Sequence, residues 1–313
     1  MNIVILDRKT LGLDIDMAIF ETFGNVKNYD CTKPNETIER LKEADIVITN
    51  KVVISKEVME NTNLKLICVT ATGMNNIDLE SAKQKNIEVK NVAGYSSASV
   101  VQLAFSMIFQ IMQKLDYYKK YVDEGNWQKS DIFTHIDKPF FELDGKKVGI
   151  IGLGDIGKNF AKKASAFDCE VMYFSTSGKN SNSEYKQVSL DELLSTCDII
   201  SIHCPLNENT KDLLNYENMK NIKDGAILLN LSRGGIINEA DLAKIIDEKE
   251  IYCGIDVVAV EPILEDNPLL KVKNKDRLLL TPHIGWASIE ARTRLVKMVA
   301  KNIKEFISQK RIS

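Results

Sequence analysis

A glycine-rich segment near the middle of the chain constrains the fold more than any other feature. Residues 146–157 read Lys-Lys-Val-Gly-Ile-Ile-Gly-Leu-Gly-Asp-Ile-Gly, and a helical pattern of apolar residues follows from Asn159 to Phe167. Between a strand and a helix, Gly152 permits a tight turn, Gly154 lets a pyrophosphate approach the backbone, and Gly157 allows the helix to pack closely on the strand. The helix N-terminus offers N–H groups and a partial positive charge to the phosphates. The segment therefore predicts a dinucleotide site, with a substantial domain before it.

Short apolar runs alternate with helical patterns on both sides of this segment, which predicts parallel sheets. Strands are expected at residues 2–6, 45–49, 64–70 and 87–89, and then at 147–151, 170–174, 198–202, 226–231, 252–256 and 278–281. Helices are expected at residues 13–23, 36–43, 78–85, 98–121, 155–167, 190–196, 238–248 and 288–308. We expect the last helix to return to the first domain.

Composition excludes several classes of partner. The net charge of −3 and the lack of a long basic run argue against nucleic acid. No apolar run approaches the length of about 18 residues that a membrane span requires, and no signal peptide is recognisable. The 6 cysteines form no Cys-x-x-Cys pair, which is typical of reduced thiols. We expect a cytoplasmic protein that binds neither membrane nor nucleic acid.

Three polar residues follow predicted strands of the second half. Arg233 precedes two glycines, and its fork of donors suits the carboxylate and carbonyl oxygens of an α-keto acid. His283 can transfer a proton near neutral pH, and Glu261 can fix its tautomer. Each also has a simpler interpretation, as a surface ion pair, a structural histidine or a solvated carboxylate. The position of Arg233 and His283 at strand ends favours a site, because open α/β sheets bind ligands there.

The other two histidines have less promising positions. His135 lies in an irregular stretch, where we interpret it as structural or interfacial. His203 precedes Cys204 and a proline, and we expect it to shape a loop against the cofactor. His203 and Cys204 lack a matching ligand cluster nearby, so we expect no metal site.

The order of these motifs resembles the D-isomer-specific 2-hydroxyacid dehydrogenase family over essentially the whole chain. The motifs are Gly-x-Gly-x-x-Gly, Arg233-Gly-Gly, Gly254-Ile-Asp256-Val, Glu261-Pro and Pro282-His283. Residues 70–78 (Thr-Ala-Thr-Gly-Met-Asn-Asn-Ile-Asp) and 91–96 (Asn-Val-Ala-Gly-Tyr-Ser) look most similar to the glycerate dehydrogenase, or hydroxypyruvate reductase, branch.

The resemblance implies an α/β fold of two doubly wound parallel-sheet domains, with a Rossmann cofactor domain inserted into a flavodoxin-like substrate domain. Residues 1–98 with 286–313 would form the substrate domain, and residues 99–285 the dinucleotide-binding domain. The implied activity is reduction of a small 2-oxo acid, such as hydroxypyruvate or glyoxylate, to the D-2-hydroxy acid by hydride transfer from NAD(P)H. Such enzymes are usually homodimers joined through the cofactor domain, for which residues 98–121 and an aromatic arm to Phe141 are candidates.

The resemblance also assigns residues to roles. The catalytic set would be Arg233, which binds the substrate carboxylate and carbonyl, Glu261 and the acid/base His283. The cofactor-binding set would be Gly152, Gly154, Asp155, Ile156, Gly157, Ser175, Thr176, His203, Pro205, Thr210, Leu231, Ser232 and Asp256, the last contacting the nicotinamide amide. The substrate-binding set would be Asn50, Thr72, Gly73, Met74 and Arg233. Trp286 either caps the pocket or packs at a domain interface.

One position departs from the dinucleotide fingerprint, which places an acid about 20 residues after the glycines to bind the ribose hydroxyls. Here Ser175 follows the strand at 170–174, and Lys179 stands nearby. The hydroxyls can bind an unmodified ribose, and with Lys179 they can bind a 2′-phosphate. We favour NAD and keep NADP as the alternative.

Other functions stay open. Among enzymes, the alternatives are a D-lactate dehydrogenase and a D-2-hydroxyacid dehydrogenase that acts on branched-chain substrates. A nucleotide-sensing binding protein, like the corepressors related to this family, is an alternative of another class.

Overall fold

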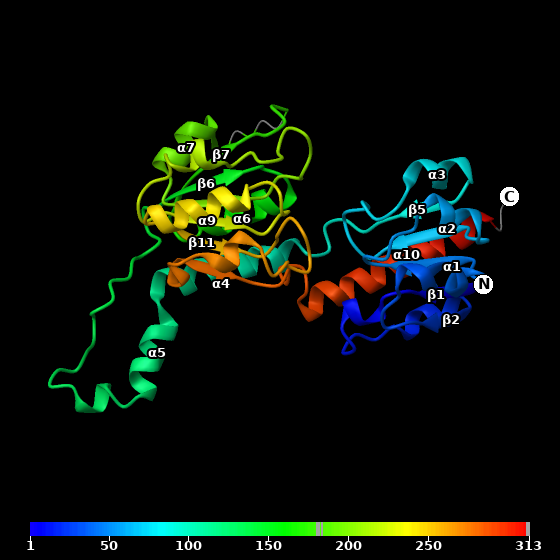
Figure 1. The fold of residues 1–313 in the computed structure, drawn as a ribbon, viewed down its shortest axis with the longest axis horizontal. Helices are drawn as coiled ribbons and strands as arrows, with labels where there is room; N and C mark the ends of the chain where they lie inside the picture. The colour runs from blue at the N-terminus through cyan, green and yellow to red at the C-terminus, as the bar shows by residue number, and fades with distance from the viewer. Residues whose placement is uncertain (180–181, 183, 311–313) are drawn as a thin grey trace. The chain divides into compact units, whose positions relative to one another are not determined.

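The computed structural model describes residues 1–179, 182 and 184–310. The polypeptide forms two compact units, one of Met1–Ser96 with Trp286–Ser313 and one of Ser97–Gly285 (Figure 1). From the sequence we placed the first boundary two residues later, after residue 98. The second unit is thus an insertion between two segments of the first, and the two are called unit 1 and unit 2.

The described part of unit 1 contains a parallel sheet of five strands in the order β2-β1-β3-β4-β5. The strands are β1 (Asn2–Ile5), β2 (Asn25–Asn28), β3 (Ile46–Thr49), β4 (Leu66–Val69) and β5 (Glu88–Lys90). All residues of β3 and β4 are buried, because both faces of the sheet are covered. The order is that of the flavodoxin-like doubly wound fold, as the sequence predicted.

Helices cover the two faces of this sheet. The long helix α10 (Ile289–Lys310) packs Leu295 and Val299 against one face, where they meet Ile3 and Ile5. The other face is covered by α1 (Thr37–Leu41), α2 (Lys56–Glu60) and α3 (Leu79–Gln84). Short 3-10 helices η1 (Arg8–Leu11), η2 (Ala18–Phe23) and η3 (Pro34–Glu36) complete the unit. The last helix belongs to the first unit.

One prediction for unit 1 was wrong, and two short elements, the helix α2 and the strand β2, were not expected. Residues 13–23 do not form one helix, because Gly12 takes a positive φ of 77° and the Arg8 guanidinium binds the carbonyls of Gly12 and Ile15, which keeps the backbone in turns. The strand β2 was not expected, since it lies at the sheet edge and is largely exposed. An exposed edge strand needs no alternation of apolar residues, so its sequence carries little signal.

In unit 2, residues 97–179, 182 and 184–285 contain a parallel sheet of seven strands in the order β12-β11-β10-β9-β6-β7-β8. The strands are β6 (Lys147–Ile151), β7 (Glu170–Phe174), β8 (Lys186–Gln187), β9 (Ile199–Ile202), β10 (Ile227–Asn230), β11 (Tyr252–Ile255) and β12 (Leu278–Leu280). We predicted six, and β8 is an additional exposed edge strand. The strand order reverses between β6 and β9, as in a Rossmann sheet, so the predicted fold class is confirmed.

The sheet of unit 2 is also covered on both faces. One face packs on α4 (Ser97–Gln113) and α6 (Asp155–Ser165). The other packs on α7 (Leu190–Thr196), α8 (Tyr216–Met219) and α9 (Glu239–Glu248). The 3-10 helices η4 (Trp127–Lys129), η5 (Pro268–Lys271) and η6 (Lys275–Arg277) lie in the connections.

The helix that we expected at residues 98–121 is broken. Lys114 takes a left-handed φ of 51°, so α4 ends there and α5 (Leu115–Asp123) continues at an angle of 57°. Residues 114–143, here called the arm, extend from the rest of unit 2 in Figure 1. No single helix in the described residues is long and apolar enough to cross a membrane, although the bent pair α4 and α5 passes that test when taken together.

Candidate active site

The glycine-rich loop joins β6 to α6 at the carboxyl edge of the sheet. A Cβ on Gly152, whose φ is +94°, would lie 2.7 Å from the amide nitrogen of Cys204, and a Cβ on Gly157 would overlap the carbonyl oxygen of Gly152. Gly154 is different, because, apart from its two chain neighbours, no residue in the described part of the protein has a heavy atom within 4 Å of a Cβ placed there. The open space beside Gly154, at the N-terminus of α6, fits a pyrophosphate group.

The next two residues of this loop, Asp155 and Ile156, begin α6. The Asp155 carboxylate accepts a hydrogen bond from the hydroxyl of Ser97, the first residue of α4. Ile156 packs against the apolar core that α4 and α6 share. Both residues therefore help to fix the glycine-rich loop on the body of unit 2.

The loop after β9 lies next to the glycine-rich loop, at the point where the strand order reverses. His203 bonds Ser201 through its Nε2 at 2.9 Å, and burial of the ring lowers the pKa of His203 to about 3. The imidazole is therefore neutral at physiological pH. Further along, the buried Thr210 donates its hydroxyl to the Pro205 carbonyl at 2.6 Å. These contacts hold the loop in shape beside the glycines.

The end of β7 carries the residue that replaces the expected acid. Ser175 is 7% exposed, and its hydroxyl has no hydrogen-bond partner among the described residues. Thr176 beside it is partly exposed. Since an unsatisfied buried hydroxyl is costly, this group fits a ligand that supplies the missing bond. A ribose hydroxyl and a phosphate oxygen both satisfy this condition.

The loop that carries Arg233 packs against the loop that carries Glu261. A Cβ on Gly234 would overlap the backbone of Val258, so only glycine permits this approach. Leu231 is buried, and the Ser232 hydroxyl donates to the Cys204 carbonyl. Arg233 itself is exposed, and its Nη1 donates to the Ser232 carbonyl at 2.7 Å.

Glu261 and His283, 22 residues apart, form the hydrogen-bonded pair at this edge. The Oε2 of Glu261 lies 2.7 Å from the Nδ1 of His283, and Oε1 accepts from the Val258 amide at 3.3 Å. An ionised carboxylate only accepts hydrogen bonds, so Nδ1 carries the proton that is shared with Glu261. The Nε2 atom is then the position at which His283 can exchange a proton with a ligand.

Asp256 has contacts that we did not expect. Its carboxylate accepts hydrogen bonds from the Thr281 hydroxyl at 2.6 Å and from the amides of Ile284 and Gly285 at 2.8 Å each. The side chain thus holds the segment around His283. No local feature of the sequence indicates these bonds, because they depend on the pairing of β11 with β12.

The candidate substrate residues lie at the carboxyl ends of β3 and β4 in unit 1. The Asn50 amide donates to the buried carboxylate of Asp7 at 2.9 Å, and the Lys51 amide does so at 2.7 Å. Asp7 was not identified from the sequence, although it directly follows the first predicted strand. It fixes the turn that carries Asn50.

The second of these turns follows β4. Thr72 donates its hydroxyl to the Val92 carbonyl at 3.0 Å, and its own carbonyl accepts from Asn91 at 2.7 Å. These bonds hold the turn that continues through Gly73 to Met74. Met74 packs partly against the apolar core of unit 1.

Among residues 1–179, 182 and 184–310, no group of three or more His, Cys, Asp or Glu side chains could hold a metal ion.

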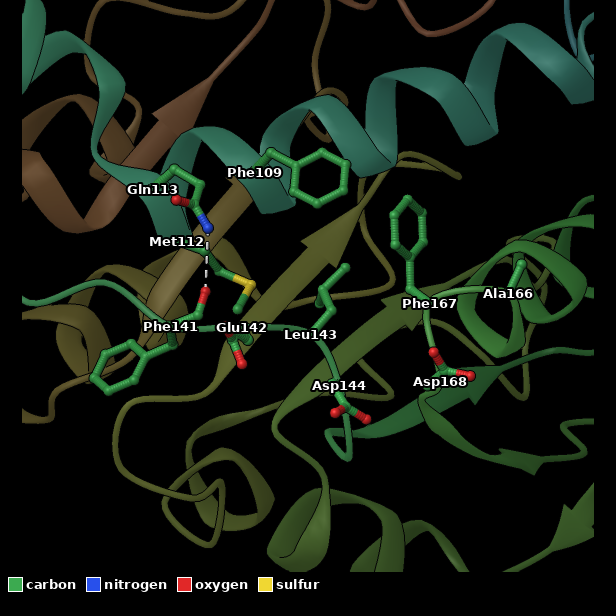
Figure 2. A pocket seen from close by; sticks show the side chains of 10 residues that line it. All are labelled: Phe109, Met112, Gln113, Phe141, Glu142, Leu143, Asp144, Ala166, Phe167 and Asp168. Carbon is green, nitrogen blue, oxygen red and sulfur yellow. Dashed lines mark hydrogen bonds between the residues drawn. The ribbon is translucent and has the colours of Figure 1, made fainter.

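A separate pocket of about 320 Å³ lies between α4, residues 141–144 and the turn before β7 (Figure 2). Its residues Asp144 and Asp168 precede β6 and β7, so this pocket lies at the amino edge of the sheet, opposite the glycine-rich loop.

Two doubly wound sheets, a glycine-rich helix N-terminus and a Glu–His pair at the same sheet edge define an NAD-dependent oxidoreductase. The sequence model described as D-isomer specific 2-hydroxyacid dehydrogenase, NAD binding domain, matches residues 105–285. The protein belongs to the D-isomer-specific 2-hydroxyacid dehydrogenase family, which confirms the resemblance found in the sequence.

Individual relatives cover nearly the whole length of the protein. It is 41% identical to a hydroxypyruvate reductase of Blautia hydrogenotrophica over 98% of this chain and 97% of that protein. It is 34% identical to a glycerate dehydrogenase of Methylorubrum extorquens over 99% and 97% of the two proteins. A solved structure of an acyclic imino acid reductase in complex with NADPH and D-Arg matches with a TM-score of 0.84 and 29% identity, over 99% of this chain and 98% of that one.

Proposed function

We propose that this enzyme reduces a small 2-oxo acid, such as hydroxypyruvate or glyoxylate, to the D-2-hydroxy acid with NAD(P)H. The single observation that carries the proposal is the Glu261–His283 pair at 2.7 Å, at the sheet edge that also holds Arg233 and the glycine-rich loop. The hydroxypyruvate reductase and glycerate dehydrogenase among the relatives support this class of substrate.

The proposed chemistry assigns one task to each side chain. When bound, NAD(P)H supplies a hydride to the keto carbon. His283 donates a proton from Nε2 to the keto oxygen, and Glu261 holds the ring in the tautomer and orientation that this transfer needs. Arg233 binds the carboxylate and keto oxygens through its donor fork and stabilises the negative charge that develops during reduction. Asn50, Thr72, Gly73 and Met74 of unit 1 would bind the carboxylate of the acid.

We propose NAD as the preferred cofactor, with NADP as the alternative. The match to an NAD-binding domain supports NAD, whereas the NADPH named with the imino acid reductase supports NADP. The loop around Gly154 would hold the pyrophosphate, and Ser175 with Thr176 would bind the ribose. The loops of His203, Pro205 and Thr210 and of Leu231 and Ser232 would line the remainder of the dinucleotide.

A steady-state panel tests this function. The oxidation of NADH and of NADPH is followed at 340 nm with hydroxypyruvate, glyoxylate, pyruvate and the 2-oxo acids of leucine and valine. We expect turnover of the first two acids. Faster turnover of pyruvate would instead identify a D-lactate dehydrogenase, and faster turnover of the larger acids would identify an enzyme for branched substrates. If no acid reacts while NADH still binds, the proposal fails and the nucleotide-sensing alternative is favoured.

The variant Arg233→Lys tests the substrate site within this proposal. Lysine keeps the charge but loses the planar fork, so the variant should show a higher KM for the acid and a lower kcat. The dissociation constant of NADH should not change, since Arg233 is assigned to the acid alone. A variant with wild-type kinetics would remove Arg233 from its assigned role.

We further propose a homodimer in which the arm packs on a second copy of the protein. The arm exposes large apolar side chains, including Phe133 (89% exposed) and Ile136 (68%). Its base is held on α4 by the Gln113 amide, which donates to the Phe141 carbonyl at 3.2 Å (Figure 2). Such an exposed apolar surface is typical of an interface.

Light scattering during gel filtration tests the dimer. The wild type should have the mass of two copies, and the double variant Phe133→Asp/Ile136→Asp should have the mass of one. A wild type that elutes as a monomer at micromolar concentration would refute this proposal.

A further inference from the structure

Two buried polar side chains lie on neighbouring strands beneath the candidate catalytic residues. Asn230 is the last residue of β10, Asp256 directly follows β11, and each is 2% exposed. The Asp256 amide donates to the Asn230 carbonyl at 2.9 Å, which continues the pairing of the two strands. Burial of such strongly polar groups is costly unless their hydrogen bonds are satisfied, so the partners of each side chain indicate its role.

Asn230 closes the turn that carries Arg233. Its Nδ2 donates to the Arg233 carbonyl at 2.9 Å, and its Oδ1 accepts from the Ser232 amide at 3.1 Å. One side chain thus holds the amide of the residue before Arg233 and the carbonyl of Arg233 itself. The exposed guanidinium therefore extends from a backbone that Asn230 fixes.

Asp256 does the same for the segment of His283. Its Oδ1 accepts from the Thr281 hydroxyl and the Ile284 amide, its Oδ2 accepts from the Gly285 amide, and its carbonyl accepts from the His283 amide at 2.9 Å. His283 takes a left-handed φ of 54°. Because this conformation is unfavourable for a residue with a Cβ, the surrounding bonds must enforce it.

We propose that Asn230 and Asp256 are positioning residues, which set the geometry of Arg233 and His283 respectively. The inference rests on the function proposed for those two side chains. Asp256 then acts through the His283 segment, in addition to the contact with the nicotinamide amide that the family resemblance implies. Errors of about 1 Å in a reacting group cost on the order of 100-fold in rate, so the effect should be large.

Isosteric variants change the hydrogen bonds of these two side chains without changing their volume. In Asp256→Asn, the amide NH2 must face at least one of the donors at residues 281, 284 and 285, and that donor loses its acceptor. In Asn230→Asp, a carboxylate oxygen faces the Arg233 carbonyl, and the two acceptors repel each other. Neither change opens a cavity.

The two variants should have different effects on kcat and KM. Asp256→Asn should lower kcat by about 100-fold with little change in KM, because proton donation matters only in the transition state. Asn230→Asp should raise KM for the 2-oxo acid as well, because Arg233 binds its carboxylate in the ground state. The dissociation constant of NADH, measured by fluorescence titration, should rise by a much smaller factor than kcat falls in Asp256→Asn.

Matched controls lie elsewhere in unit 2. Asp198→Asn alters a carboxylate at the amino edge of the same sheet that accepts from the Lys147 amide at 2.9 Å. Asn218→Asp alters an amide with the same pair of contacts as Asn230, since it donates to the Leu213 carbonyl and accepts from the Asn215 amide. Both controls should change the unfolding temperature without the kinetic changes. Equal kinetic losses in the controls would overturn the proposal.

A spectroscopic measurement separates this proposal from the proposed function. The 15N signals of the imidazole rings of the full-length protein report the tautomer and hydrogen bond of His283. They should change in Asp256→Asn and not in Asp198→Asn, whether or not any 2-oxo acid is turned over. If they do not change, or if the NADH dissociation constant rises as much as kcat falls, Asp256 is not a positioning residue.

A milder variant covers the case in which Asp256→Asn fails to fold. Thr281→Val removes one donor to the Asp256 carboxylate and keeps the side-chain volume. It should lower kcat by a smaller factor with KM unchanged. A wild-type kcat in folded Thr281→Val together with wild-type 15N signals would refute the role of Asp256.

Discussion

Replacing Glu261 with glutamine tests the central contact of the proposed active site. The Glu261 carboxylate lies 2.7 Å from the Nδ1 of His283. Glutamine keeps the size of the side chain but removes its charge. Negative charge on Glu261 stabilises the imidazolium that donates the proton, so the variant should slow reduction of the 2-oxo acid.

The magnitude follows from the geometry. Opposite charges about 4 Å apart at an effective dielectric constant of about 20 attract by about 4 kcal/mol. The side chains of His283 and Glu261 are 26% and 31% exposed, so water screens part of this attraction. A value of about 2 kcal/mol, which is typical of hydrogen bonds to charged groups, corresponds to a loss of about 30-fold in kcat/KM.

The assay is the steady-state oxidation of NADH with hydroxypyruvate, accompanied by the thermal unfolding midpoint and the dissociation constant of NADH. The control is Glu36→Gln in unit 1, where the carboxylate also accepts from a backbone amide, that of Lys33, and pairs with a cation, Arg40. The control should leave kcat/KM unchanged. A folded Glu261→Gln variant with less than about a twofold loss in kcat/KM would refute the assigned role. Each 1.4 kcal/mol corresponds to about tenfold, so such a loss is far below the expected value of about 2 kcal/mol.

Three further predictions concern the cofactor domain. Ser175→Asp should raise the ratio of kcat/KM with NADH to that with NADPH, because a carboxylate repels a 2′-phosphate; an unchanged ratio would place Ser175 away from the ribose. Gly154→Ala should fold normally and weaken NADH binding, whereas Gly152→Ala should lower the unfolding temperature, because only the second introduces a clash within the protein. Burial lowers the pKa of His203 to about 3 from 6.5, so the unfolded protein takes up a proton first as pH falls. The stabilising effect of the neutral ring is complete above the pKa that the histidine has in the unfolded protein, and it is lost as the pH falls from about 6.5 to 3. Between about pH 7.5 and pH 5.5, the unfolding free energy measured with urea should therefore fall by about 1.4 kcal/mol less in His203→Gln than in the wild type. An identical pH dependence in the variant would contradict this assignment.

The regular elements with a buried face were predictable from the sequence. The continuous apolar runs of β3, β4 and β9 and the pattern of α6 report burial directly, and the described structure has these elements at the expected places. The edge strands β2 and β8 were missed, because exposed strands carry no such pattern. The break at Lys114 was also missed, since its left-handed φ leaves no mark in apolar periodicity.

The class of protein could be read from the residues in their linear order. The three glycines, and the placement of Arg233, Glu261 and His283 shortly after strands, depend on local geometry, because the carboxyl ends of parallel strands share one edge of a sheet. Which side chains touch became visible only in three dimensions. The Glu261–His283 bond and the buried contacts of Asn230 and Asp256 arise because β10, β11 and β12 are neighbours in the sheet. Strand order is a property of the whole fold, and no local pattern encodes it.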